Sequence, residues 1–299
     1  MATDEKFTIA VFTKNTTNPA YEAFRIAADQ VARAAGAKVV HYVPKQPDNV
    51  GEQQAMVEQV LKDRPDAVIF IPVDDVAMVD SVKKLNEAKI PVVLASNPLP
   101  GQFVTFVGAD DFEIGYKQAR YLFDKLGGKA KIVVIEGVPA APTNRERVRG
   151  YKRAFAEYPG IEVLGSGVGN YQQPDAKRVM AKFLAEHSQI DAVLSANDGM
   201  ALGALEALKE ANRTAAVIGI NGILPAVKLI ETGALLASVD FNMFKIGCTA
   251  TRAALRHLRG EKLPEKIMLP AEIIDKSNYK AWLVPVEQRT CPEWSEVVR

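Results

Sequence analysis

The sequence predicts an α/β protein of two lobes, each a doubly wound parallel sheet with helices on both faces. The first observation is an internal repeat, in which residues 66–97 and 191–222 both begin with Asp-Ala-Val. Each copy reads as an apolar strand, a polar turn, an amphipathic helix and a second apolar strand, and each follows a similar strand–helix–strand unit. The second observation is the length of 299 residues, which suits about two domains. A repeated α/β unit in a chain of this length predicts two similar halves.

Strands and helices alternate along the whole chain. Short runs rich in Val and Ile suit parallel strands that are buried on both faces. They cover residues 8–12, 38–43, 67–71, 92–95, 104–108, 132–136, 162–168, 192–196, 217–220 and 237–241. Apolar residues at helical spacing lie between these runs. They predict helices over residues 20–35, 51–62, 76–88, 113–126, 145–158, 175–187, 199–211, 225–232 and 244–259.

The lobes are predicted to be discontinuous, because no linker rich in Gly, Ser or Pro separates the halves. Ordered segments near residues 107–111, 239–242 and 270–276 are predicted to cross instead, and three crossings permit hinge bending. We therefore expect an N-terminal lobe of residues 1–108 plus 241–271. The C-terminal lobe is expected to contain residues 109–240 plus 272–299, with residues 279–299 as a tail extension.

Two helix starts carry a local signal. Asn18 precedes Pro19, which places a capping side chain next to a proline at the first helical position. Asp198 is predicted to cap the helix through residues 199–211. Glycines follow several of the predicted helices, as is usual at helix ends.

Composition excludes several classes of function. A net charge of +1 gives no bulk attraction to nucleic acid or anionic membranes. No apolar run approaches the ~18 residues of a spanning helix, and "MATDEKFTIAV" lacks the features of a signal peptide. The two cysteines, Cys248 and Cys291, are interpreted either as two thiols or as a disulfide that attaches the tail to the helix over residues 244–259.

Catalytic and metal-binding motifs are absent from the sequence. His41, His187 and His257 lack metal-ligand spacing, and neither a P-loop nor a GxSxG motif occurs. The acidic pairs Asp74-Asp75 and Asp110-Asp111 are interpreted as solvated or capping groups at turns. We therefore predict a binding protein without enzymatic activity, catalytic residues, cofactor or metal.

Four segments together resemble the type I periplasmic binding proteins, in particular the ribose-binding-protein branch of ABC-transporter solute receptors. They are "NTTNPAYEAF", "NRERVRGY", "SANDGMALGALEAL" and "VIGINGILPA", and the resemblance covers roughly residues 7–278. It implies a monomeric periplasmic protein, with its signal peptide absent from this sequence, that delivers a solute to an ABC permease. Lactose-repressor-type regulators share this core but carry a helix-turn-helix in front of it. The first predicted strand starts within ten residues of the N-terminus, so no nucleic-acid partner is expected.

The resemblance also implies the ligand-binding positions, which follow the carboxyl ends of the strands in both lobes. These positions are Lys14, Asn15, Tyr21, Ser96, Asn97, Arg147, Tyr171, Asn197, Asn221, Asp240 and Phe241. Amides and a guanidinium can form paired hydrogen bonds with hydroxyl groups, and the aromatic rings can stack on an apolar C–H face. A neutral monosaccharide or small polyol is therefore the predicted ligand. Relatives often carry Asp-Arg at Ser96-Asn97, Asp at Asn221 and an aromatic ring at Ala20, so a pentose, branched sugar or sugar alcohol is expected at least as readily as ribose.

Alternative interpretations remain open from the sequence. Asn18, Asn197 and Asn221 can serve loop or helix backbone, Arg147 can lie on a helix surface, and Lys14 can be solvated. The same fold can bind a non-sugar signal, such as a quorum-sensing furanosyl compound or a small amide. It can also form the sensor core of a repressor that lacks its DNA-binding domain.

Overall fold

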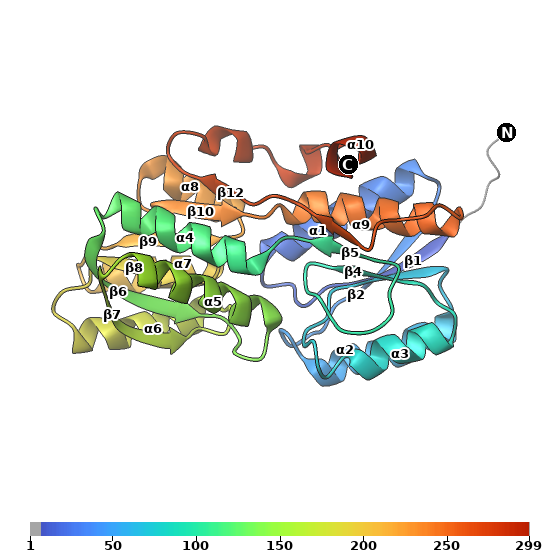
Figure 1. Ribbon diagram of the computed structural model, residues 1–299, viewed down its shortest axis with the longest axis horizontal. Coiled ribbons are helices and arrows are strands. Elements are labelled where there is room, and N and C mark those ends of the chain that lie inside the picture. The colour runs from blue at the N-terminus through green and yellow to red at the C-terminus, as the bar shows by residue number, and fades with distance from the viewer. Residues whose placement is uncertain (1–6, 299) are drawn as a thin grey trace. The chain divides into compact units, whose positions relative to one another are not determined.

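The computed structural model describes residues 7–298 and divides into two compact units. The described part of unit 1 comprises residues 7–109, Asn242–Leu269 and residues 286–298, and unit 2 comprises Asp110–Phe241 and Pro270–Pro285. Both are layered α/β structures, as Figure 1 shows.

Unit 1 contains a six-stranded sheet in the order β11-β5-β4-β3-β1-β2, in which every pairing is parallel. Helices α1 and α9 pack together on one face, and α2 and α3 pack together on the other (Figure 1). The elements of unit 1 are β1 (Thr8–Phe12), α1 (Pro19–Ala34), β2 (Lys38–Tyr42), α2 (Val50–Asp63), β3 (Ala67–Phe70), α3 (Val79–Glu87), β4 (Val92–Ala95), β5 (Thr105–Gly108), α9 (Met243–Leu258), β11 (Lys266–Met268), η2 (Val286–Gln288) and α10 (Trp294–Val297).

Unit 2 repeats this order as β12-β10-β9-β8-β6-β7, except that the edge strand β12 runs antiparallel to β10. Helices α4 and α5 form one packed pair, and α6 and α7 form another. The elements of unit 2 are α4 (Asp111–Lys125), β6 (Lys129–Glu136), α5 (Pro142–Glu157), β7 (Gly160–Val168), α6 (Gln173–Glu186), β8 (Ala192–Ser195), α7 (Asp198–Glu210), β9 (Ala216–Ile220), α8 (Leu224–Thr232), β10 (Ala237–Asp240), β12 (Glu272–Ile274) and η1 (Tyr279–Trp282).

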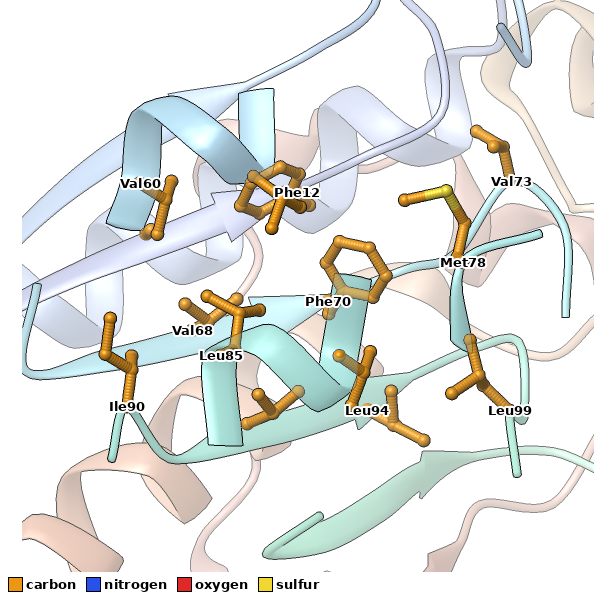
Figure 2. Close-up of a cluster of buried hydrophobic side chains, with 14 of the residues drawn as sticks. Phe12, Val60, Val68, Phe70, Val73, Met78, Leu85, Ile90, Leu94 and Leu99 are labelled. Atoms are coloured by element: carbon orange, nitrogen blue, oxygen red, sulfur yellow. The ribbon is translucent and has the colours of Figure 1, made fainter. Parts of the chain in front are cut away.

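In each unit, an apolar core between the sheet and its helices holds the strands in place. In unit 1, side chains from β1, β3 and β4 meet side chains from α2 and α3, with Phe12 and Phe70 at the centre (Figure 2). In unit 2, Phe123 packs against Phe155 and Tyr158 beneath β6, β8 and β9. Rigidly packed strands hold the residues that follow their carboxyl ends in fixed positions, where α/β folds bind ligands.

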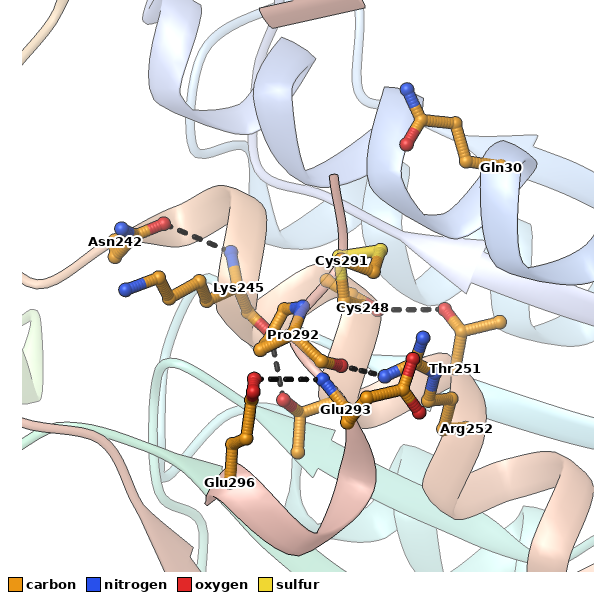
Figure 3. Close-up of a disulfide and its surroundings, with 12 residues drawn as sticks. Gln30, Asn242, Lys245, Cys248, Thr251, Arg252, Cys291, Pro292, Glu293 and Glu296 are labelled. Atoms are coloured by element: carbon orange, nitrogen blue, oxygen red, sulfur yellow. Dashed lines mark hydrogen bonds between the residues drawn. A yellow bond between two sulfur atoms is a disulfide. The ribbon is translucent and has the colours of Figure 1, made fainter. Parts of the chain in front are cut away.

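The predicted strands and helices are confirmed, with ends that shift by up to three residues. The short strands β11 and β12 were not predicted. The structure also differs over the tail, which was expected to lie wholly in the C-terminal lobe. Its last part belongs to unit 1, where Cys291 forms a disulfide with Cys248 of α9 (Figure 3). The chain therefore passes between the units four times rather than three.

Within residues 7–298, the helices are all too short or too polar to span a bilayer.

Candidate functional site

The predicted ligand residues form two groups, one in each unit, and both lie at the carboxyl ends of strands. Unit 1 holds Lys14, Asn15, Tyr21, Ser96 and Asn97. Unit 2 holds Arg147, Tyr171, Asn197, Asn221, Asp240 and Phe241. Each group is described within its own unit.

Lys14 and Asn15 share one carboxylate directly after β1. Lys14 Nζ lies 3.0 Å from Asp48 Oδ1, and Asn15 Nδ2 donates to Asp48 Oδ2 at 3.2 Å. Lys14 is only 1% exposed, so the alternative of a solvated lysine is wrong. The Asn15 side-chain oxygen accepts from the Asn18 amide, which ties this loop to the start of α1. Burial without a partner would disfavour the ammonium strongly, and Asp48 supplies that partner.

The start of α1 confirms the predicted cap. The Asn18 side chain accepts from the Ala20 amide, with Pro19 at the first helical position. Tyr21 is half-buried in the first turn of this helix. The cap fixes the direction in which α1 leaves the loop that contains Lys14 and Asn15, and with it the position of Tyr21.

Ser96 and Asn97 follow β4, where the chain turns sharply. Ser96 has a positive φ of 58°, and Asn97 is 1% exposed. Asn97 Nδ2 donates to the Pro72 carbonyl at 3.1 Å, which fixes the amide. Its Oδ1 atom is buried and accepts no hydrogen bond from the described residues. A buried acceptor of this kind costs about 1–3 kcal/mol, so it suits a hydrogen bond from a bound molecule.

A close helix crossing in unit 2 positions Arg147. The two helices α4 and α5 meet at Gly150, where an added Cβ would lie 2.3 Å from the Phe112 carbonyl oxygen. Only a glycine permits this approach. The crossing brings Arg147 of α5 next to Asp111, the first residue of α4.

The Arg147 guanidinium is buried and held on two sides. Its Nε and Nη2 atoms lie 2.9 and 2.8 Å from Asp111 Oδ1, and Nη1 donates to the Ala196 carbonyl at 2.8 Å. It also lies 5.4 Å from the centre of the Phe241 ring. Burial has the largest single effect and would lower the pKa of Arg147, but the attraction of Asp111, with contributions from Tyr171 and Tyr151, outweighs burial in sum and the pKa is raised. Arg147 is 3% exposed, so the alternative of a surface helix residue is wrong.

Tyr171 and Asn197 are joined by one hydrogen bond. Asn197 Nδ2 donates to the Tyr171 carbonyl at 3.2 Å, and Asn197 Oδ1 accepts from the Met200 amide at 2.8 Å. The cap of α7 is therefore Asn197, and the prediction that Asp198 caps this helix is wrong. The Tyr171 hydroxyl shares a 3.0 Å hydrogen bond with Thr143. Both ends of the tyrosine are thus fixed.

Asp198 instead braces the turn that carries Asn221. Its carboxylate accepts from the Ile223 amide at 2.9 Å and from the Ser238 hydroxyl at 2.7 Å. Ser238 Oγ in turn accepts from the Gly222 amide at 3.0 Å. Complete burial raises the pKa of Asp198 to about 7, although these hydrogen bonds oppose the shift. Asn221, with a φ of 126°, is thereby held beside the end of β10.

Asp240 and Phe241 complete the unit 2 group. Asp240 is 5% exposed, and its Oδ2 atom accepts from Trp282 Nε1 in the tail at 2.7 Å. Phe241 is also buried and packs against the Arg147 guanidinium. Arg147, Phe241 and the Asn197 turn therefore form one contiguous group. Asn221 directly follows β9, and Asp240 is the last residue of the adjoining strand β10.

The sequence did not predict the residues that hold the candidate site residues in place. Asp48 and Asp111 are the counter-charges of the two buried cations, although Asp111 was interpreted as a solvated or capping acid. Gln172, next to Tyr171, has a buried Nε2 atom that donates no hydrogen bond to a described residue. A buried partner was to be expected for Asp111 only once Arg147 itself was known to be buried.

The described residues contain no group of three or more His, Cys, Asp or Glu side chains that could hold a metal ion. The candidate site consists of amides, paired charges and aromatic rings, which are groups that can form hydrogen bonds and stacking contacts with a small polar molecule.

Comparison with known proteins identifies the family of the chain. A family model described as "Periplasmic binding protein domain" matches residues 9–262. The ribose import binding protein of Bacillus subtilis is 31% identical over 270 residues, covering 90% of this chain and 87% of the relative. A putative rhizopine-binding protein of Rhizobium meliloti is 31% identical, covering 77% of this chain and 78% of that protein.

Solved structures agree in fold over nearly the whole chain. A solute-binding protein of an ABC transporter from Actinobacillus succinogenes, with bound D-allose, superposes with a TM-score of 0.88 at 26% identity. It covers 92% of this chain and 100% of its own. One from Bacillus halodurans with bound myo-inositol gives 0.87 at 26% identity, covering 95% and 99%.

These relatives are binding proteins rather than enzymes, which confirms the predicted class, the two-lobed fold and the ribose-binding-like branch. The chain is therefore a member of the periplasmic binding protein family.

Proposed function

We propose that this protein is the solute receptor of an ABC importer and binds one neutral monosaccharide or small polyol between the two groups of site residues. The observation that carries the proposal is the state of the two buried cations. Lys14 and Arg147 are each neutralised by a carboxylate, Asp48 and Asp111. A site whose charges are already paired favours an uncharged ligand, because a ligand charge would be buried without a partner.

The remaining polar groups suit hydroxyls. Asn97 Oδ1 offers an acceptor, and the Arg147 guanidinium has five N–H donors, of which Asp111 and Ala196 engage only some. Tyr21, Tyr171 and Phe241 offer ring faces for the C–H side of a sugar. The relatives point the same way, since their names or structures carry ribose, D-allose and myo-inositol.

The proposed mechanism is a population shift. A ligand that contacts both units only when they close stabilises the closed state and shifts the equilibrium toward it. The closed monomer then presents both units to a membrane permease. A periplasmic location fits the Cys248–Cys291 disulfide, because disulfides persist in oxidising compartments.

A calorimetric titration tests the proposal, with D-ribose, D-allose, xylitol and myo-inositol as ligands. Asn221→Gly removes a proposed contact without strain, because glycine adopts the φ of 126° readily. We expect the wild type to bind at least one of these ligands and this variant to bind it at least tenfold more weakly. Arg149→Ala is the control, because the Arg149 side chain is 65% exposed on the same helix as Arg147.

Two results would count against the proposal. Absence of heat with every sugar and polyol, together with heat from a furanosyl signal compound or a small amide, would reassign the ligand class. Undiminished binding by Asn221→Gly would show that the site residues are placed wrongly.

A further inference from the structure

The tail of the chain is attached to both units, and one of its attachments is a proposed ligand residue. Residues 279–298 lie beyond the 9–262 segment that the family model matches. Residues 279–285 of this tail belong to unit 2, and residues 286–298 belong to unit 1. We call residues 279–298 the strap.

The unit 2 end of the strap is anchored at Asp240. Here Trp282 Nε1 donates to Asp240 Oδ2 at 2.7 Å. An indole has this single donor, and a carboxylate that accepts it is held in one orientation by a charge-assisted hydrogen bond. Residues of η1 also pack against α8, which follows the turn carrying Asn221. The strap therefore supports two neighbouring parts of the unit 2 group.

The unit 1 end of the strap is anchored covalently. Cys291 is bonded to Cys248 in α9, as Figure 3 shows, and Arg252 donates to the Pro292 carbonyl one residue later. The Trp294 ring lies 4.6 Å from the Arg256 guanidinium. Nearer the crossing, Gln30 donates to the Glu287 carbonyl at 3.2 Å. The strap is thus fixed at several points along α1 and α9.

We propose that Trp282 is a positioning residue for ligand binding, which orients the Asp240 carboxylate, and that the Cys248–Cys291 disulfide keeps the strap in place to do so. The proposal rests on the proposed function of the site. A carboxylate that is held in one orientation can meet ligand hydroxyls only from certain directions. It therefore favours a ligand with one arrangement of hydroxyls over the epimers of that ligand. The oxidation state of the disulfide then contributes to ligand affinity.

The test uses the full chain and the tightest ligand among D-ribose, D-allose, xylitol and myo-inositol. Trp282→Phe keeps a ring but removes the donor. We expect this variant to weaken binding about five- to tenfold, because Asp240 loses the hydrogen bond that orients it. We also expect a smaller affinity ratio between D-ribose and D-allose. Trp294→Phe is the matched control, because Trp294 lies in the same strap and packs on Arg256 instead.

A double-mutant cycle distinguishes positioning from general support. In an Asp240→Ala background, Trp282→Phe should cause no further loss of affinity, because the group that it positions is gone. The Cys248→Ser, Cys291→Ser double variant should weaken binding in the same direction as Trp282→Phe but less. Wild-type protein treated with a reductant should behave as this double variant does.

The outcomes separate the two proposals. Wild-type protein that binds none of the four ligands would overturn the proposed function and this inference with it. Binding that is unchanged by Trp282→Phe, or weakened equally with and without Asp240, would overturn the inference alone. Unchanged affinity in the double serine variant would overturn the role given to the disulfide.

Discussion

The two units share a strand order and each buries one cation–carboxylate pair, but they build these pairs differently. In unit 1, Lys14 and Asp48 both lie in loops, after β1 and before α2. In unit 2, Arg147 and Asp111 lie in helices whose crossing is fixed by Gly150. An ammonium is a point charge, whereas a guanidinium fork requires a defined orientation. The comparison teaches that the more directional group is carried by the more rigid support.

Removing the two cations is expected to have the largest effect. Arg147→Met leaves Asp111 buried without its partner and should lower the free energy of unfolding by about 3–5 kcal/mol. Lys14→Met should cost less, because Lys14 makes one ion pair whereas Arg147 also binds the Ala196 carbonyl. Urea unfolding monitored by circular dichroism measures both. A greater loss of unfolding free energy in Lys14→Met than in Arg147→Met would contradict this ranking of the two ion pairs.

The close helix crossings offer a second comparison. An added Cβ at Gly150 would lie 2.3 Å from the Phe112 oxygen, and one at Gly247 in α9 would lie 2.5 Å from the Phe24 oxygen. Each glycine-to-alanine change should cost about 1–3 kcal/mol by overpacking. Only Gly150→Ala should also weaken ligand binding, because it displaces the helix that carries Arg147. Titration calorimetry that finds equal affinities in the two variants would contradict this.

In unit 2, a buried acid of raised pKa holds the turn that carries Asn221. The pKa of Asp198 is raised by burial from 3.8 to about 7, so the folded protein keeps a proton that the unfolded chain releases. Stability should therefore fall as pH rises from about 4 to about 7, and level off above that. Asp198→Asn cannot ionise and should show a flatter dependence in urea unfolding at pH 5, 6, 7 and 8. Identical slopes for variant and wild type would rule out this contribution.

The smallest effects are expected at two asparagine caps near the candidate site. Asn18 caps α1 in unit 1, and Asn197 caps α7 in unit 2. Alanine at either position should lower stability by about 1 kcal/mol. Asn197→Ala should in addition reduce ligand affinity, since it also releases the Tyr171 carbonyl. A melting-temperature shift for Asn18→Ala that far exceeds that for Asn197→Ala would show that the two caps are not equivalent.

The sequence predicted the strands and helices well because their buried apolar residues are regularly spaced and because the two halves of the chain are similar to each other. It failed where that regularity ends. Strands β11 and β12 have three residues each, which is too short for an apolar pattern. The strap has no periodicity, and its place in unit 1 depends on a disulfide that the two cysteines left undecided.

The prediction of the candidate site has a different limit. The resemblance implies ligand-binding positions after the strands, but it does not give the partners that neutralise Lys14 and Arg147. Asp48 and Asp111 are far from those cations in sequence and come near only through tertiary packing. The same limit applies to Asp198, because its role as a brace depends on Ser238, forty residues away.

The two short strands beyond residue 262 form the outermost strand on one side of each sheet. In unit 1, β11 covers β5, and in unit 2, β12 covers β10. Unpaired border strands present rows of unused backbone donors and acceptors, which invite pairing with other chains. A chain cut after residue 262 would keep every residue that the family model matches. It would nevertheless make β5 and β10, whose residues are all buried in the full chain, the outermost strands, which favours self-association.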